Sequence, residues 1–99
     1  MFTDPSTISK HKKVILNIGS MSRCNPCRTI APVYEELEKQ YSDITFFKMD
    51  SDEYQDMCDQ LNITSIPTFI SIYNGKEVAR FSGCNKGKLE KLLNDLQKL

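Results

Sequence analysis

Short apolar runs alternate with longer segments of helical spacing along this chain of 99 residues. Three runs of apolar and β-branched residues are short enough to be buried strands, and they cover 14–18, 44–49 and 68–73. The dipeptide Asn74-Gly75 follows the third run and is a strong signal for a two-residue hairpin turn. Segment 77–82 is therefore predicted to be an antiparallel strand that returns along the third run.

Between these runs, apolar residues recur at the three- and four-residue spacing of helices. Segment 29–41 has one apolar face, segment 52–61 predicts a short polar helix, and Asn85 can cap a last helix with a stripe of leucines. The resulting order is β-α-β-α-β-β-α. It predicts a single α/β domain over residues 1–99, with a right-handed parallel crossover between the first two strands and helices on both faces of a mixed sheet.

Charge and composition narrow the classes of partner. Lys plus Arg number 13 and Asp plus Glu number 13, so a formal net charge of zero gives no general attraction to nucleic acid or to an anionic membrane. The sequence has no apolar run long enough to span a bilayer, and its first residues lack the pattern of a signal peptide. We therefore expect a protein without nucleic-acid or membrane partners in the reducing cytoplasm.

Four cysteines carry the candidate chemistry: Cys24, Cys27, Cys58 and Cys84. Cys24 and Cys27 are too close in sequence to staple a fold, so they point to redox chemistry or to a metal. They lie between a predicted strand and a predicted helix. Backbone N–H groups at the start of a helix favour a thiolate, which is the reactive form of cysteine. Arg23 and Arg28 flank the pair and favour the same charge state.

The expected mechanism is dithiol–disulfide exchange without a metal or an organic cofactor. Cys24, expected to be the more exposed thiol, attacks a substrate disulfide, and Cys27 then attacks Cys24 to release the reduced substrate. A structural zinc site with four thiolates is the alternative. It is disfavoured because Cys58 and Cys84 do not form a second Cys-x-x-Cys pair.

Further motifs resemble the thioredoxin family over nearly the whole chain. They are Cys24-x-Pro26-Cys27-Arg28, Ile30-Ala31-Pro32, Lys48-x-Asp50-x-Asp52, Ile66-Pro67-Thr68-Phe69, Asn74-Gly75 and Phe81-Ser82-Gly83. The resemblance implies a thioredoxin fold and a protein-disulfide reductase. It also implies protein disulfides as substrates, a thioredoxin reductase as electron donor and no cofactor beyond a Cys24–Cys27 disulfide. The segment 82–86 resembles the eukaryotic cytosolic branch.

The resemblance also implies a substrate site around the two cysteines. Pro67 should follow a cis peptide bond and face the pair, which leaves the Ile66 backbone free to pair with an extended substrate. The residues that border the cysteines complete the implied substrate-binding set: Arg23, Asn25, Pro26, Gly83 and Cys84. Cys84 is a candidate for a regulatory disulfide or a glutathione adduct, with a merely exposed thiol as the alternative.

The sequence departs from the family inside the motif. Arg23 replaces the usual tryptophan, and Asn25 replaces the usual glycine. The family's buried aspartate lies six positions before the first cysteine, where this chain has Ile18. Asn17 is expected to point to the opposite face of the strand, because side chains alternate. With no aspartate as partner, Lys48 is expected to reach the surface, and the alternative is that it stays near the sulfurs and favours a thiolate.

The N-terminal segment is the other departure, because only residues 1–13 precede the first strand. Asp4 and Pro5 can start one short helix there, but a preceding strand scarcely fits. We therefore expect four strands in the order second, first, third, fourth. The second strand then forms an edge, which favours either a covering by 1–13 or a weak dimer.

Two other functions remain open at this stage. A disulfide oxidant or isomerase with the same fold is favoured if Arg23 and the missing aspartate stabilise the thiolate. A binding module that traps substrates without turnover is the second alternative, and the intact cysteine pair argues against it.

Overall fold

The computed structural model describes residues 5–99 and contains one mixed sheet of four strands. In chain order the elements are a 3-10 helix η1 (Pro5–Lys10), β1 (Lys13–Gly19), α1 (Asn25–Gln40), β2 (Thr45–Asp50), α2 (Gln55–Gln60), β3 (Thr68–Tyr73), β4 (Lys76–Ser82) and α3 (Lys86–Gln97). The strand order is β2-β1-β3-β4, as the sequence predicts. Strands β1 and β2 are parallel, and the other two pairings are antiparallel.

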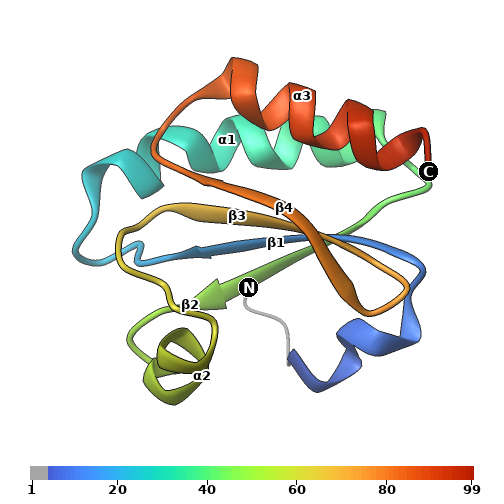
Figure 1. The fold of residues 1–99 in the computed structure, drawn as a ribbon. Coiled ribbons are helices and arrows are strands. Elements are labelled where there is room, and N and C mark those ends of the chain that lie inside the picture. The colour runs from blue at the N-terminus through green and yellow to red at the C-terminus, as the bar shows by residue number, and fades with distance from the viewer. Residues whose placement is uncertain (1–4) are drawn as a thin grey trace.

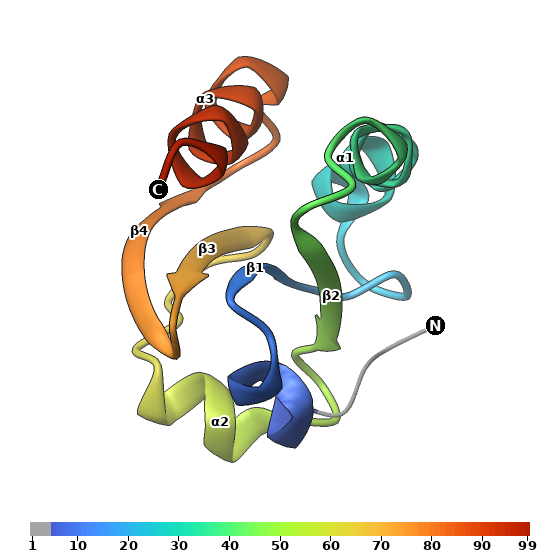
Figure 2. The same cartoon turned by 90° about the vertical axis from the view of Figure 1, so that its right-hand side faces the viewer.

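Helices cover both faces of this sheet. Figure 1 shows α1 and α3 along one face, with α2 and η1 against the other, and the turned view in Figure 2 shows the same layers. Each face has its own apolar core. Ile15 and Phe69 belong to the core under α1 and α3, whereas Val14, Leu16 and Ile70 belong to the core on the α2 side. The alternation of side chains along a strand therefore decides which residues face the active-site helix.

Two predicted helices differ from their observed bounds. The first was predicted over 29–41 but begins at Asn25, because Pro26 suits the first turn and Cys24 caps the helix. The second was predicted over 52–61 but is a single short helix, Gln55–Gln60. Its start is delayed because the Asp50 carboxylate accepts a hydrogen bond from the Asp52 backbone N–H at 2.8 Å and holds a turn there.

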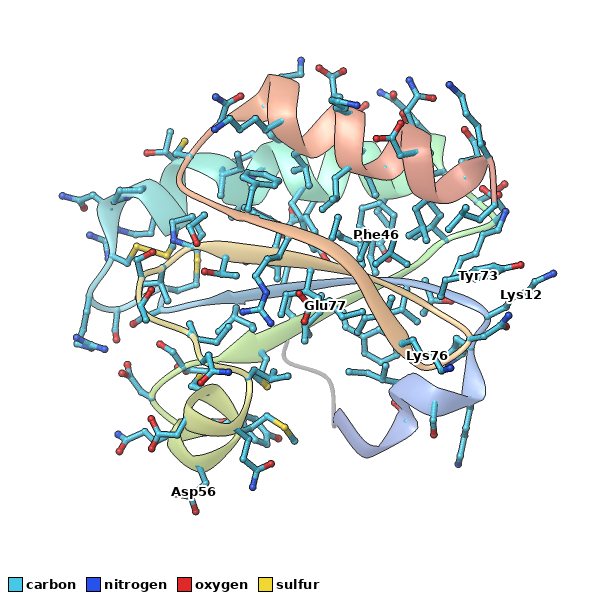
Figure 3. All side chains as sticks on the ribbon, in the orientation of Figure 1. Lys12, Phe46, Asp56, Tyr73, Lys76 and Glu77 are labelled. Carbon is cyan, nitrogen blue, oxygen red and sulfur yellow. A yellow bond between two sulfur atoms is a disulfide. The ribbon has the colours of Figure 1, made fainter. Side chains whose placement is uncertain are left out.

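The hairpin between β3 and β4 lies at the end of the sheet opposite the cysteines. Asn74 and Gly75 both have positive φ angles, 51° and 81°, as a tight hairpin turn requires. Figure 3 shows Lys12, Tyr73 and Lys76 at this end, and the yellow disulfide at the other. The Lys12 ammonium lies 5.8 Å from the centre of the Tyr73 ring.

The N-terminal segment forms the short helix η1, but its proposed cap, Asp4, lies outside the described residues. Ile8 in this helix packs against the core on the α2 side. Within residues 5–99, β2 pairs with β1 alone, so it is an edge of the sheet.

Candidate active site

Cys24 and Cys27 are joined by a disulfide at the start of α1. Cys24 is the N-cap of the helix, and its sulfur accepts a hydrogen bond from the Cys27 backbone N–H at 3.2 Å. The helix start thus provides the N–H donor that stabilises a Cys24 thiolate once the disulfide is reduced. The two residues are 7% and 4% exposed, so Cys24 is the more accessible by a small margin.

Gly19 allows the end of β1 to pass directly behind Cys27. A Cβ atom at this position would lie 2.9 Å from the Cys27 sulfur, which is closer than real Cβ atoms come. The Gly19 carbonyl accepts a hydrogen bond from the Ser51 N–H at 2.9 Å, which ties the end of β1 to the loop after β2. Any side chain at position 19 would displace the second cysteine.

Asn17, and not Ile18, is the β1 side chain on the Cys27 side of the sheet. Asn17, Cys27 and Lys48 line a cavity of about 20 Å³, whereas Ile18 is fully buried in the core on the α2 side. The prediction that Ile18 takes the place of the family's buried aspartate, made by counting six positions back from Cys24, was therefore wrong for this chain. Strand alternation does place Asn17 opposite Ile18, as expected, but that opposite face is the one toward α1.

Lys48 combines both expected positions, because its side chain lines the cavity with Cys27 while its ammonium reaches an exposed carboxylate at the surface. It lies beside Asn17 in the register of β2 and β1, and its side chain is 23% exposed. Its ammonium pairs with the Glu35 carboxylate on α1 at 3.0 Å, and this contact lowers the pKa of Glu35. The Asn17 side-chain oxygen is buried and has no hydrogen-bond partner in the described structure.

The two arginines of the motif have different partners. Arg23 forms an ion pair with Asp52, the residue two positions beyond the end of β2, at 2.6 Å. This contact lowers the pKa of Asp52 and raises that of Arg23. Arg28 instead donates to the Met21 carbonyl at 2.6 Å and to the Asn25 side-chain oxygen. Sequence reasoning missed the Arg23–Asp52 contact, and only the shared motif Lys48-x-Asp50-x-Asp52 drew attention to that aspartate.

The other residues of the predicted substrate-binding set lie at the start of α1, at the cis peptide bond before β3 and in the loop after β4. Ile66 and Pro67 are joined by a cis peptide bond, and the Ile66 carbonyl oxygen lies 3.8 Å from the Cys24 sulfur. The Gly83 N–H donates to the Pro67 carbonyl at 2.9 Å, so the loop after β4 is fixed to the same place. Asn25 and Pro26 are exposed at the start of α1.

Cys58 and Cys84 do not complete a metal site with the motif. Cys58 is buried on α2, which raises the pKa of its thiol, and Cys84 is an exposed free thiol after Gly83. Within residues 5–99, His, Cys, Asp and Glu side chains form no group of three or more that could hold a metal ion. The zinc alternative therefore lacks its set of ligands in this part of the chain.

A polar hollow of about 410 Å³ lies between the active-site loop and α2. Arg23 and Ile66 stand on its walls together with Asp52, Cys58 and Asp59. Ile66 connects this hollow to the disulfide, because its carbonyl oxygen lies 3.8 Å from the Cys24 sulfur. None of the helices in the described residues is both long and apolar enough to cross a bilayer.

Comparisons with known proteins agree with this geometry. A sequence model of the family described as Thioredoxin matches residues 5–96. Thioredoxin H2 of Arabidopsis thaliana is 36% identical over 90 residues, which cover 91% of this chain and 68% of that protein. Thioredoxin of Sus scrofa is 35% identical over 88 residues, covering 89% and 84%. A structure of Plasmodium falciparum thioredoxin superposes with a TM-score of 0.86 at 39% identity, covering 91% of this chain and 87% of that one. This chain belongs to the thioredoxin family.

Proposed function

We propose that residues 1–99 work as one domain that reduces protein disulfides, with Cys24 as the attacking thiol and Cys27 as the resolving thiol. The family and the disulfide-bonded pair make the chain a thiol–disulfide oxidoreductase. The observation that carries the assignment of roles is the Cys27 N–H, which donates to the Cys24 sulfur at the helix start. That donor stabilises negative charge on Cys24 and not on Cys27.

The reaction proceeds in two exchanges. The Cys24 thiolate attacks one sulfur of the substrate disulfide, forms a mixed disulfide with it and expels the other sulfur as a thiolate. Cys27 loses its proton and attacks the Cys24 sulfur, which forms the Cys24–Cys27 disulfide and expels the second substrate thiolate. Two electrons pass from the dithiol to the substrate, whose thiolates take up two protons.

The substrate lies in an extended form across the Cys24 side of the disulfide, which is the more accessible one. Support comes from the Ile66 backbone, whose carbonyl is 3.8 Å from the Cys24 sulfur and is positioned to pair with a strand of substrate. Arg23, Asn25 and Pro26 border one side of this strand. Gly83 and Cys84 border the other, because Gly83 is hydrogen-bonded to the Pro67 carbonyl.

A thioredoxin reductase regenerates the dithiol in this proposal, and the protein works in the cytoplasm as a monomer or a weak dimer. The support for a reductase as donor is the family itself. The support for a weak dimer is β2, which pairs with only one strand in residues 5–99.

Substitution of each cysteine tests the assigned roles. Cys24→Ser should abolish disulfide reduction, whereas Cys27→Ser should accumulate a covalent mixed disulfide with substrate that mass spectrometry detects. Cys58→Ser is the matched control and should retain activity, because Cys58 is buried on α2. Faster alkylation of Cys27 than of Cys24 in the reduced protein would show that the roles are reversed.

A disulfide oxidant is the second candidate function. One observation favours it: Asn17, a neutral side chain, faces Cys27 with no carboxylate beside it in that cavity. Absence of a negative charge there stabilises the reduced dithiol, and a stabilised reduced form makes a stronger oxidant. A redox titration separates the two candidates, since thioredoxin has a potential of about −270 mV and a strong disulfide oxidant about −120 mV.

A further inference from the structure

The ion pair between Arg23 and Asp52 connects the residue before Cys24 to the loop after β2. The guanidinium donates to the Asp52 carboxylate through two nitrogens, Nη2 at 2.6 Å and Nε at 3.0 Å. Two donors fix the plane of the guanidinium as well as its position. The Arg23 charge is therefore held on the side of α2.

Neighbouring hydrogen bonds hold both ends of this pair. The Ser20 hydroxyl donates to the Asp52 carboxylate at 3.0 Å and accepts from the Arg23 backbone N–H at 3.2 Å. The Asp52 backbone N–H is bound in turn to the Asp50 carboxylate at 2.8 Å. Asp52 is thus fixed before it meets Arg23, and the arginine is the more movable member, with a side chain that is 63% exposed.

The Arg23 side chain can also reach a second position, beside the Cys24 sulfur. Consecutive Cα atoms are only about 3.8 Å apart, so an arginine side chain that is not held elsewhere can swing toward the sulfur of the next residue. A guanidinium near that sulfur stabilises the thiolate strongly. We propose that Asp52 is a positioning residue for the thiol–disulfide reaction, which holds the Arg23 guanidinium on the α2 side and keeps it off the Cys24 sulfur.

This inference rests on the proposed role of Cys24 as the attacking thiol. The pair contributes little to stability, because both side chains are exposed to solvent. Its effect is on the charge beside the sulfur. The other charged groups near this site include Arg28 at the start of α1, Asp50 at the end of β2, Asp59 on α2 and Lys48, which lines the cavity with Cys27. None of them changes in these variants.

A double-mutant cycle measures the proposed positioning. The variants are Asp52→Asn, Arg23→Gln and the combination of both, and the readout is the alkylation rate of Cys24 against pH in the reduced protein. At about pH 6 we expect Asp52→Asn to react roughly threefold faster or more, which corresponds to half a unit in the Cys24 pKa. Arg23→Gln should react more slowly than the wild type.

The decisive quantity is whether these two effects add. Simple long-range repulsion from Asp52 would speed the reaction by the same factor when position 23 is Gln. Positioning predicts a smaller factor in that background, since no guanidinium remains to be released. Additive factors, or an Asp52→Asn variant that is no faster than the wild type, would overturn the inference.

A remote ion pair provides the matched control. Arg80 and Glu77 on β4 form a similar two-pronged contact, with distances of 2.6 and 2.5 Å. Glu77→Gln should leave the alkylation rate of Cys24 unchanged. Mapping the alkylated cysteine in every variant separates the two hypotheses: labelling of Cys27 first would refute the proposed role of Cys24, whereas Cys24 labelling with additive rates refutes only the role of Asp52.

Discussion

At the scale of single residues, the side chain behind Cys27 decides how the Cys27 thiol loses its proton during the second exchange. That side chain is Asn17, which has the shape of an aspartate but whose amide cannot accept the proton of a thiol. General-base assistance of this kind is typically worth about a hundredfold or more. The second exchange should therefore be slow at neutral pH and should quicken as the pH rises, because the Cys27 thiol must ionise into solvent.

Asn17→Asp should accelerate that exchange near pH 7. The new carboxylate occupies the same cavity as Cys27 and has the Lys48 ammonium as a neighbour, so it can take the proton. The same negative charge should raise the Cys24 pKa and lower the free energy of unfolding, because the position is largely buried. Rapid mixing of a preformed mixed disulfide measures the step directly.

Ile18→Asp is the matched control for this prediction. It introduces the same carboxylate one residue away, but into the apolar core on the α2 side. It should destabilise the fold without accelerating the second exchange. If the wild-type exchange is already fast and independent of pH, or if both variants accelerate it equally, Asn17 is not the group that limits the step.

At the scale of elements, one tyrosine on the active-site helix is hydrogen-bonded to the sheet beneath it. The Tyr34 hydroxyl on α1 is buried and donates to the Phe47 carbonyl at 2.6 Å and to the Ile15 carbonyl at 3.1 Å. These carbonyls belong to β2 and β1, so a single hydroxyl bridges the parallel pair. Burial raises the pKa of Tyr34 well above its ordinary value.

Tyr34→Phe should lower the free energy of unfolding by about 1 kcal/mol, the usual contribution of one buried hydrogen bond. The raised pKa also links this group to pH: its stabilisation is fully present below about pH 10 and is lost as the pH rises toward the folded-state pKa. The wild type should therefore lose stability more steeply above about pH 10 than the variant does. Urea denaturation at several pH values measures both effects, with Tyr73→Phe at the far end of the sheet as control.

The elements themselves could be predicted because local patterns specify them. The Asn74-Gly75 dipeptide favours the positive φ angles of a tight hairpin turn, and the structure has them there. Helix α3 begins after Asn85, whose side-chain oxygen accepts a hydrogen bond from the Lys88 N–H at 2.9 Å. The cysteine pair was found for the same reason, since its chemistry depends on a short spacing. Local patterns say less about loops and distant contacts. Counting back from Cys24 pointed to Ile18, whereas Asn17 is the side chain that lines the cavity with Cys27. The Arg23–Asp52 contact joins residues that are 29 positions apart in the sequence.

At the scale of the whole molecule, the sheet separates two apolar cores that have different tasks. The core under α1 and α3 fixes the helix that carries the cysteines, and it contains Ile30, Tyr34, Leu37 and leucines of α3. The core on the α2 side fixes the loops that carry Asp52 and Ile66. The disulfide lies at one end of the sheet, at the start of α1 (Figure 3), and residues from both halves contribute to the site there.

The strand order also predicts how fast backbone amide hydrogens exchange for deuterium in heavy water. Strands β1 and β3 are in the middle of the sheet and are hydrogen-bonded on both sides, whereas β2 and β4 have a neighbour on one side only within residues 5–99. Amides of β1 and β3 should exchange for deuterium only when the whole domain opens, and those at the outer sides of β2 and β4 should exchange through local fraying. Exchange followed by NMR would show a slow centre and two fast borders. Helix α1, which carries the cysteines at its start, follows the slowly exchanging strand β1 in the chain. The redox pair is therefore anchored to the part of the molecule that opens last.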